Sequence, residues 1–272
     1  MNNFNKKILL LGGAGYVGTE LTKFLLKNSF SVTNIDNLIY DNFYSIKDFI
    51  DNPNYTFINS NIDSENINKN FLNNYSSVII LSGLVGDPIT KKYTSLASEY
   101  NENYIKKFII KSNECKINKL IFISTCSNYG LINNDIPAKE DHELNPLSHY
   151  AKSKISIEKF IQENSKKNNY QSTILRFATA FGVSSRMRFD LTISHFTKDA
   201  LITKKLKVYD KETWRPYCHI KDFANLIELI INNKLHYKCE IFNSGGNNNN
   251  YTKKIIAETI ENFIPDLKIE YH

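Results

Sequence analysis

The feature that most constrains the fold of this chain is a glycine-rich turn near the N-terminus. The turn, Gly12–Gly18, follows the short apolar run Ile8–Leu11 and leads directly into the amphipathic segment Tyr16–Lys27. Its glycines fit both the GxGxxG and the GxxGxxG spacing. A buried strand that turns tightly into a helix is the first half of a βαβ unit. The turn therefore predicts a parallel sheet that starts at this end of the chain.

The rest of the chain repeats the alternation of short apolar runs and longer helical segments, which is typical of a parallel sheet covered on both faces. We expect an α/β fold, a doubly wound parallel sheet (Rossmann) over residues 1–177, with a smaller, interleaved C-terminal substrate lobe over residues 178–272. The expected strands are Ile8–Leu11, Val32–Ile35, Tyr55–Ile58, Val78–Leu81, Leu120–Ile123, Thr173–Phe177 and Leu206–Val208. The expected helices are Tyr16–Lys27, Glu65–Asn73, Leu96–Cys115, Ser148–Glu163, Leu191–Ile202, Ile220–Ile231 and Lys253–Phe263.

Composition narrows the class of protein. A chain of 272 residues buries enough surface to fold without disulfides. Its four cysteines match no CxxC spacing, so we expect neither a metal site nor a disulfide framework. The apolar runs are too short to span a bilayer and none resembles a secretory signal, which predicts a cytoplasmic protein. The net charge of +6 comes from scattered lysines without an arginine-rich stripe, and does not predict nucleic-acid binding.

Asp36 gives the glycine turn a chemical meaning. Glycine turns without a ligand are common, but here an acidic residue ends the second expected strand, 18 residues after Gly18. In that place a carboxylate accepts hydrogen bonds from the adenosine ribose of a dinucleotide, whose pyrophosphate lies on the helix N-terminus. Asn37 and Leu38 supply no arginine for a 2′-phosphate, so the sequence favours NAD over NADP. Asp63 could contact the adenine side or cap a helix over Ser64–Tyr75.

Tyr150 and Lys154 indicate catalysis. Residues four apart share one helix face, so the ammonium of Lys154 can lie near the phenol of Tyr150. A free tyrosine has a pKa of about 10, and bringing it to about 7 requires roughly 4 kcal/mol. A neighbouring lysine and a positively charged nicotinamide ring could supply this. A YxxxK match alone could be surface decoration, but this one follows an expected strand that ends in Ser124-Thr125.

Together these motifs resemble the extended short-chain dehydrogenases/reductases, specifically the NAD-dependent nucleotide-sugar epimerases and dehydratases related to UDP-glucose 4-epimerase. The resemblance runs from Lys7 to about Ile260. Besides the features above, it is carried by the segments Leu81–Pro88, Ser124–Gly130, Tyr150–Lys154, Leu175–Gly182, Ser185–Asp190 and Trp214–Asp222, and by Asn101.

The resemblance implies roles for individual residues. Thr125 would hydrogen-bond the sugar oxygen that is oxidised, Tyr150 would be the general base, and Lys154 would hold the tyrosine and the nicotinamide ribose. The implied cofactor-binding residues are Gly12, Gly15, Tyr16, Val17, Gly18, Asp36, Asn37, Ile62, Asp63, Leu81, Ser82, Gly83, Asn101, Tyr150, Lys154 and Phe177. The implied substrate-binding residues are Thr125, Thr179, Arg186, Arg188 and Arg215.

Three of these assignments have alternatives. Arg215 would bind the substrate diphosphate, or pair with Asp222. Arg186 and Arg188 would bind substrate, or lie at a subunit contact. The resemblance also implies a homodimer formed through the helices at Leu96–Cys115 and Ser148–Glu163, which could instead be plain core packing.

Two departures from the family pattern bear on function. Where family 4,6-dehydratases carry an Asp-Glu pair after the catalytic threonine, this chain has Cys126 and Ser127, so we do not expect water elimination. The chain also ends a few tens of residues earlier than is usual for the family, which predicts a substrate lobe that is short at its C-terminal end.

The resulting hypothesis is an NAD-dependent nucleotide-sugar 4-epimerase that acts on a nucleotide-diphosphate sugar through a transient 4-keto sugar. A C4 oxidase or 4-keto reductase would use the same residues and differ only in whether the ketone leaves. A non-catalytic NAD-binding protein is the alternative from another class.

Overall fold

The computed structural model describes residues 6–86, 90, 92–132 and 137–272. Its centre is a seven-stranded sheet in the order β10-β6-β5-β4-β1-β2-β3, in which every neighbouring pair is parallel. The predicted α/β doubly wound fold is therefore confirmed. The strands are β1 Lys7–Leu11, β2 Ser31–Asp36, β3 Tyr55–Asn59, β4 Ser77–Ile80, β5 Lys119–Thr125, β6 Gln171–Phe177 and β10 Cys239–Ser244. Asp87 and Pro88, from the matched segment Leu81–Pro88, lie outside the described residues.

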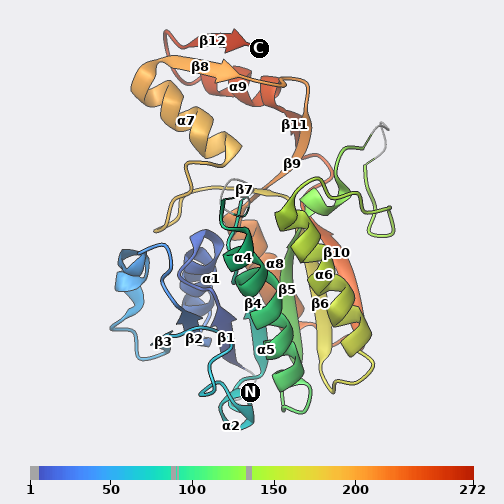
Figure 1. The fold of residues 1–272 in the computed structure, drawn as a ribbon. Coiled ribbons are helices and arrows are strands. Elements are labelled where there is room, and N and C mark those ends of the chain that lie inside the picture. Colours follow the sequence, from blue (N-terminus) through green and yellow to red (C-terminus); the bar gives the residue numbers. More distant parts are fainter. Residues whose placement is uncertain (1–5, 87–89, 91, 133–136) are drawn as a thin grey trace.

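The two faces of the sheet bury alternate side chains of each central strand. In β1, Ile8 and Leu10 join a core with α1 (Tyr16–Lys27) and α8 (Ile220–Asn232). Leu9 and Leu11 join a second core with α5 (Tyr104–Ser112) and α6 (His149–Asn164). Figure 1 shows α1 and α8 on one side of the sheet and α5 and α6 on the other. Because both faces are covered, the central strands are apolar throughout, and their position could be read from the sequence.

Two predicted helices differ from the structure. The segment Glu65–Asn73 forms only the short helix α2, Lys69–Leu72, whose first turn is capped by the Asn68 side chain accepting from Phe71 N. The prediction that Asp63 could cap a helix over Ser64–Tyr75 was therefore wrong. The segment Leu96–Cys115 is interrupted: α4, Thr94–Ser98, passes through a π-helical turn at Glu99–Asn103 before α5 begins.

Beyond β6 the chain contributes to both the sheet and a smaller lobe. Helix α8 packs on α1, and β10 extends the sheet beside β6. The lobe lies beyond the carboxyl ends of the main strands (Figure 1) and has its own apolar core around Phe196, Leu206 and Ile256. Its elements are β7 Thr179–Phe181, α7 Thr192–Thr203, β8 Lys205–Val208, β9 Trp214–His219, β11 Asn250–Thr252, α9 Lys253–Glu261 and β12 Lys268–Tyr271.

No helix within the described ranges is long and apolar enough to cross a membrane. In the same part of the chain there is no cluster of three or more His, Cys, Asp or Glu residues that could hold a metal ion.

Candidate active site

A deep pocket opens at the carboxyl ends of β1, β2, β4, β5 and β6, where ligands bind in open parallel sheets. Its lining joins the glycine turn, the loops after β2 and β4, the end of β5, the first turns of α6 and residues 186–191 of the segment 182–191. The segment 182–191 is fixed against α1: the Tyr16 hydroxyl donates to Gly182 O at 2.7 Å, and Ser184 Oγ donates to Tyr16 O at 2.8 Å. Segments far apart in sequence thus share one cavity.

The glycine turn leaves no room for side chains at two points. Gly12 has φ +84°, and a Cβ there would lie 2.6 Å from the Cα of Ser82 on the neighbouring loop. A Cβ at Gly18 would lie 2.6 Å from the Cα of Gly13, so helix α1 approaches the turn closely only with glycine at this position. No side chain caps the N-terminus of α1. Its first residues, Tyr16, Val17 and Gly18, line the pocket, and the backbone N–H groups of a helix N-terminus suit an anionic pyrophosphate.

Asp36 lies at the end of β2 beside this turn. Its Oδ2 accepts from Ala14 N at 3.0 Å and its Oδ1 accepts from Leu38 N at 2.9 Å. Burial raises the pKa of this carboxyl, while the two backbone hydrogen bonds and the positive charge of Arg186 act in the opposite direction. The carboxylate is therefore held in one orientation at the pocket wall, as an acceptor for ribose hydroxyls must be.

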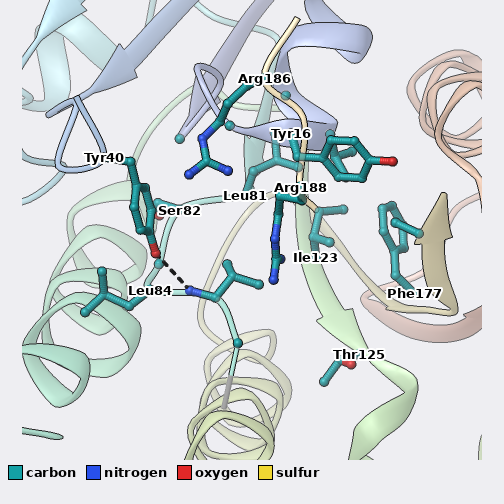
Figure 2. Close-up of a pocket in the computed structure, with 18 of the residues that line it drawn as sticks. Tyr16, Tyr40, Leu81, Ser82, Leu84, Ile123, Thr125, Phe177, Arg186 and Arg188 are labelled. Carbon is teal, nitrogen blue, oxygen red and sulfur yellow. Dashed lines mark hydrogen bonds between the residues drawn. The ribbon is translucent and has the colours of Figure 1, made fainter. Parts of the chain in front are cut away.

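Arg186 reaches this side of the pocket from a distant part of the chain. Its guanidinium lies 4.6 Å from the centre of the Tyr40 ring, which comes from the loop after β2. The Tyr40 hydroxyl accepts from Val85 N at 3.3 Å, in the loop after β4. Figure 2 shows Arg186 beside Tyr40 at one end of the pocket and Thr125 at the other. Tyr40 was missed in the sequence because a surface-loop tyrosine carries no motif of its own.

Thr125, Tyr150 and Lys154 all line this pocket. Thr125 ends β5, and Ser148 caps α6 by accepting from Ala151 N at 3.2 Å, so Tyr150 and Lys154 stand in the first turns of that helix. Lys154 Nζ donates to Ile123 O at 2.9 Å and lies 5.7 Å from the centre of the Tyr150 ring. Burial lowers the pKa of Lys154 to about 8, with the negative charge of Glu158 opposing this shift.

Arg188 lies near the same residues. Its guanidinium pairs with Asp190 through two hydrogen bonds, one of them from Nε at 3.1 Å. Burial lowers the pKa of Arg188, but Asp190 and the nearby phenols of Tyr150 and Tyr40 outweigh this and raise that pKa above its usual value. Thr179 also lines the cavity. Both arginines of the segment Ser185–Asp190 thus face the pocket, and the structure brings them together with the Tyr-Lys pair.

Most of the residues named from the sequence line this one pocket, and three do not. Asn101 instead holds the loop after β4: its Oδ1 accepts from Leu84 N at 2.6 Å and its Nδ2 donates to Leu84 O at 3.0 Å. Asp63 lies just beyond the lining residue Ile62, with its backbone oxygen accepting from Lys111. The residues that do line the pocket are Gly12, Gly15, Tyr16, Val17, Gly18, Asp36, Asn37, Ile62, Leu81, Ser82, Gly83, Thr125, Tyr150, Lys154, Phe177, Thr179, Arg186 and Arg188.

Arg215, the third, is exposed on β9 outside the pocket lining. Its guanidinium lies beside the thiol of Cys126, which does line the pocket. Burial raises the pKa of the Cys126 thiol, and the charge of Arg215 opposes this. The predicted alternative, an ion pair with Asp222, is not among the salt bridges of the described residues.

The parallel sheet, the glycine turn, Asp36 and the Tyr-Lys pair define a Rossmann protein of the short-chain dehydrogenase/reductase type. The sequence profile of the NAD dependent epimerase/dehydratase family matches residues 8–245. The chain belongs to this family, and it is an NAD-dependent enzyme, as the sequence predicted.

Known relatives agree with this assignment. The chain is 26% identical to the Bacillus subtilis protein named "Uncharacterized UDP-glucose epimerase YtcB", over 92% of this chain and 80% of that protein. It is 24% identical to a UDP-glucose 4-epimerase of Halalkalibacterium halodurans, over 80% of this chain and 68% of that protein. The crystal structure of UDP-glucuronic acid 4-epimerase from Bacillus cereus, in complex with UDP-glucuronic acid and NAD, superposes with a TM-score of 0.85 at 25% identity, covering 97% of this chain and 85% of that one.

Proposed function

We propose that this protein is a nucleotide-sugar 4-epimerase that works through a transient 4-keto sugar. One observation carries the proposal: the glycine turn with Asp36 and the set Thr125, Tyr150 and Lys154 line the same pocket. The similarity to 4-epimerases of UDP-sugars supports this choice of reaction.

The cofactor half of the pocket fits NAD. The turn has room only for glycine at Gly12 and Gly18. The N-terminus of α1 has no side-chain cap, and Asp36 presents a fixed carboxylate. Leu81, Ser82, Gly83 and Phe177 would contact the cofactor farther along the pocket. When bound, NAD would supply the hydride acceptor for C4 of the sugar and the donor for its return.

The chain's own residues would move the proton. Tyr150, as general base, would take the proton of the C4 hydroxyl and return it after the ketone has turned its other face. The Lys154 ammonium would stabilise the phenolate, because an opposite charge nearby favours the charged form. Thr125 Oγ1, at the end of β5, would hydrogen-bond the same sugar oxygen and hold it against Tyr150.

The cations around the pocket would bind the substrate. Arg188 and Thr179 line the pocket, and Arg215 stands next to Cys126, which also lines it. A forked guanidinium is suited to a diphosphate, so we assign Arg188 and Arg215 to the nucleotide diphosphate sugar. Arg186, stacked on Tyr40 beside Asp36, would act closer to the cofactor than to the sugar.

The turn after Thr125 favours epimerisation over dehydration. Water elimination needs a second acid and base, and the two positions after Thr125 hold Cys126 and Ser127. Burial raises the pKa of the Cys126 thiol, so it stays protonated at neutral pH. Neither side chain can replace a carboxylate.

The test is a reaction with no added cofactor. The purified protein is incubated with UDP-glucose, UDP-glucuronic acid or UDP-N-acetylglucosamine, and the products are resolved by NMR. We expect many turnovers to the C4 epimer of one of these sugars. A reaction that stops after one equivalent, with reduced cofactor accumulating, would instead identify a C4 oxidase. Bound NAD without conversion of any nucleotide sugar would favour a non-catalytic binding protein.

We also propose that the protein forms a homodimer through the face of α4, α5 and α6, and that it is located in the cytoplasm. Leu96 and Ile110 are exposed on this face, 42% and 57% respectively, which is the kind of apolar surface that a second copy covers. The four cysteines are all free thiols, in keeping with a reducing compartment. Light scattering of the purified protein tests the dimer, and Ile110→Glu should convert it to a monomer.

A further inference from the structure

Behind the proposed catalytic residues lies a buried ion pair that the reaction described above does not use. The side chains of Glu158 in α6 and Arg176 in β6 are only 2% and 3% exposed. Arg176 Nη2 donates to Glu158 Oε2 at 2.8 Å, and its Nε donates to the same oxygen at 3.2 Å. Burying such a pair gains little stability over apolar residues of similar volume. A role in the adjacent chemistry would explain why a buried ion pair is present here.

Glu158 also holds the turn that carries Thr125. Its Oε1 accepts from the Ser124 hydroxyl and from Asn128 Nδ2, the latter at 2.7 Å. Ser124 directly precedes Thr125, and Asn128 lies three residues after it. Both carboxylate oxygens are therefore hydrogen-bonded, which holds the group in a fixed place inside the protein.

The same carboxylate lies on the helix face of the Tyr-Lys pair. Tyr150, Lys154 and Glu158 follow one another at intervals of four residues along α6, so their side chains share one side of the helix. Lys154 is buried against β5, where its Nζ donates to the carbonyl of Ile123 and lies 4.7 Å from the centre of the Phe122 ring. Neither of these β5 contacts carries a charge.

Few groups therefore determine the charge state of Lys154. Burial lowers the pKa of Lys154 to about 8, and the charge of Glu158 opposes that shift. The other charged or titratable groups near this face include Tyr150 on α6, Arg176 on β6, Tyr129, which accepts from Arg176, and Arg188, which interacts electrostatically with Tyr150. Glu158 is the charged group that acts on the pKa of Lys154 and opposes the effect of burial.

We propose that Glu158 is a positioning residue, whose buried carboxylate keeps Lys154 in its ammonium form and fixes the Thr125 turn beside it. The effect of Glu158 on catalysis rests on the proposed function. Arg176 has the supporting part: it satisfies the remaining lone pairs of Glu158 and ties the carboxylate to β6.

The test follows the protonation of Lys154 directly. Protein labelled with ¹³C at lysine Cε is titrated by NMR, and the resonance of Lys154 is assigned by its loss in Lys154→Met. Glu158→Gln should lower the midpoint of that resonance by about one pH unit or more, because a nearby opposite charge typically shifts a pKa by about 1–3 units. Glu163→Gln, an exposed position farther along α6, is the matched control and should leave the midpoint unchanged. An unchanged midpoint in Glu158→Gln would overturn the inference.

The pH profile of kcat gives the second measurement. In Glu158→Gln the alkaline fall of kcat should move to lower pH, by about the same interval as the NMR midpoint, with little change in KM for the nucleotide sugar. Glu158→Asp keeps the charge and should keep the wild-type midpoint. A fall in kcat at all pH values, with the alkaline fall in its original place, would reduce Glu158 to a structural residue.

A double variant covers the case in which Glu158→Gln does not fold. Glu158→Gln/Arg176→Met removes both buried charges, which proteins tolerate better than one unpaired charge. Its Lys154 midpoint should still lie below that of the wild type, and a wild-type midpoint here would also reject the proposal. Because the NMR titration needs no substrate, a protein that epimerises no nucleotide sugar would contradict the proposed function without deciding this one.

Discussion

The two halves of the pocket are built by different means. The half assigned to the cofactor consists largely of main chain: the glycine turn, the start of α1 and the loops after β2 and β4. The half assigned to the sugar consists of individual side chains on β5 and α6. Recognition by main chain depends on shape, so a single added methyl group disturbs it. Chemistry by side chains depends on single polar atoms, which can be removed while the fold stays intact.

The largest expected effect tests the side-chain half. Tyr150→Phe removes one oxygen, and we expect kcat to fall by about 10²–10⁴-fold, the usual cost of losing a general base. NAD binding and the melting temperature should remain close to those of the wild type, since the ring is kept. Turnover and thermal unfolding are measured on the same preparation. Activity that survives this change would remove Tyr150 from the mechanism.

Asp36→Ala tests a side chain that belongs to the half of the pocket formed largely by main chain. We expect NAD binding to weaken by about 1.5–3 kcal/mol, the worth of hydrogen bonds to a charged group. Discrimination against NADP should relax, more so because Arg186 lies close enough for its charge to act on Asp36. Calorimetric titration with both cofactors measures this. Equal binding of NAD and NADP by the wild type would show that Asp36 does not select the cofactor.

Gly18→Ala tests whether shape governs the main-chain half. The new Cβ would lie 2.6 Å from backbone atoms of Gly13, which cannot rotate away, so α1 has to shift. We expect a loss of about 1–3 kcal/mol in the free energy of unfolding, as for other overpacked sites, together with weaker NAD binding. The control is Gly15→Ala, whose Cβ would meet only Gly12 O, at 3.4 Å. Equal stability of the two variants would contradict the close approach of α1 to the turn.

The smallest expected effect concerns the contact that spans the cofactor half. Arg186→Ala removes the guanidinium from the Tyr40 ring, a contact worth about 0.5–1 kcal/mol at a partly exposed site. NAD should dissociate about two to five times faster from the variant than from the wild type in stopped-flow measurements. Tyr40→Ala should have a similar effect, and the double variant should add little to either change. Fully additive effects would mean that the two residues act on the cofactor independently.

The sequence predicted the regular parts of the molecule well. Helix α1 begins and ends where predicted, because a glycine turn and a strongly amphipathic segment leave little choice. The buried parallel strands were readable as apolar runs. In contrast, β10 and β12 were missed: their side chains are largely half-buried or exposed, so they lack such a run and are strands only because β6 and β8 pair with them.

What the sequence determined by itself was the fold class, the family and the NAD cofactor, since these rest on local spacings: glycines in one turn, an acid after the second strand, and Tyr150 one helical turn before Lys154. Only the tertiary structure decided which distant charges meet. It placed Arg186 next to Asp36, where the sequence had suggested no arginine, and brought Arg176 to Glu158 below the Tyr-Lys pair. Electrostatic interactions act through space, so the charge environment of the pocket exists only after packing has brought β5, β6, α6 and the segment 182–191 together.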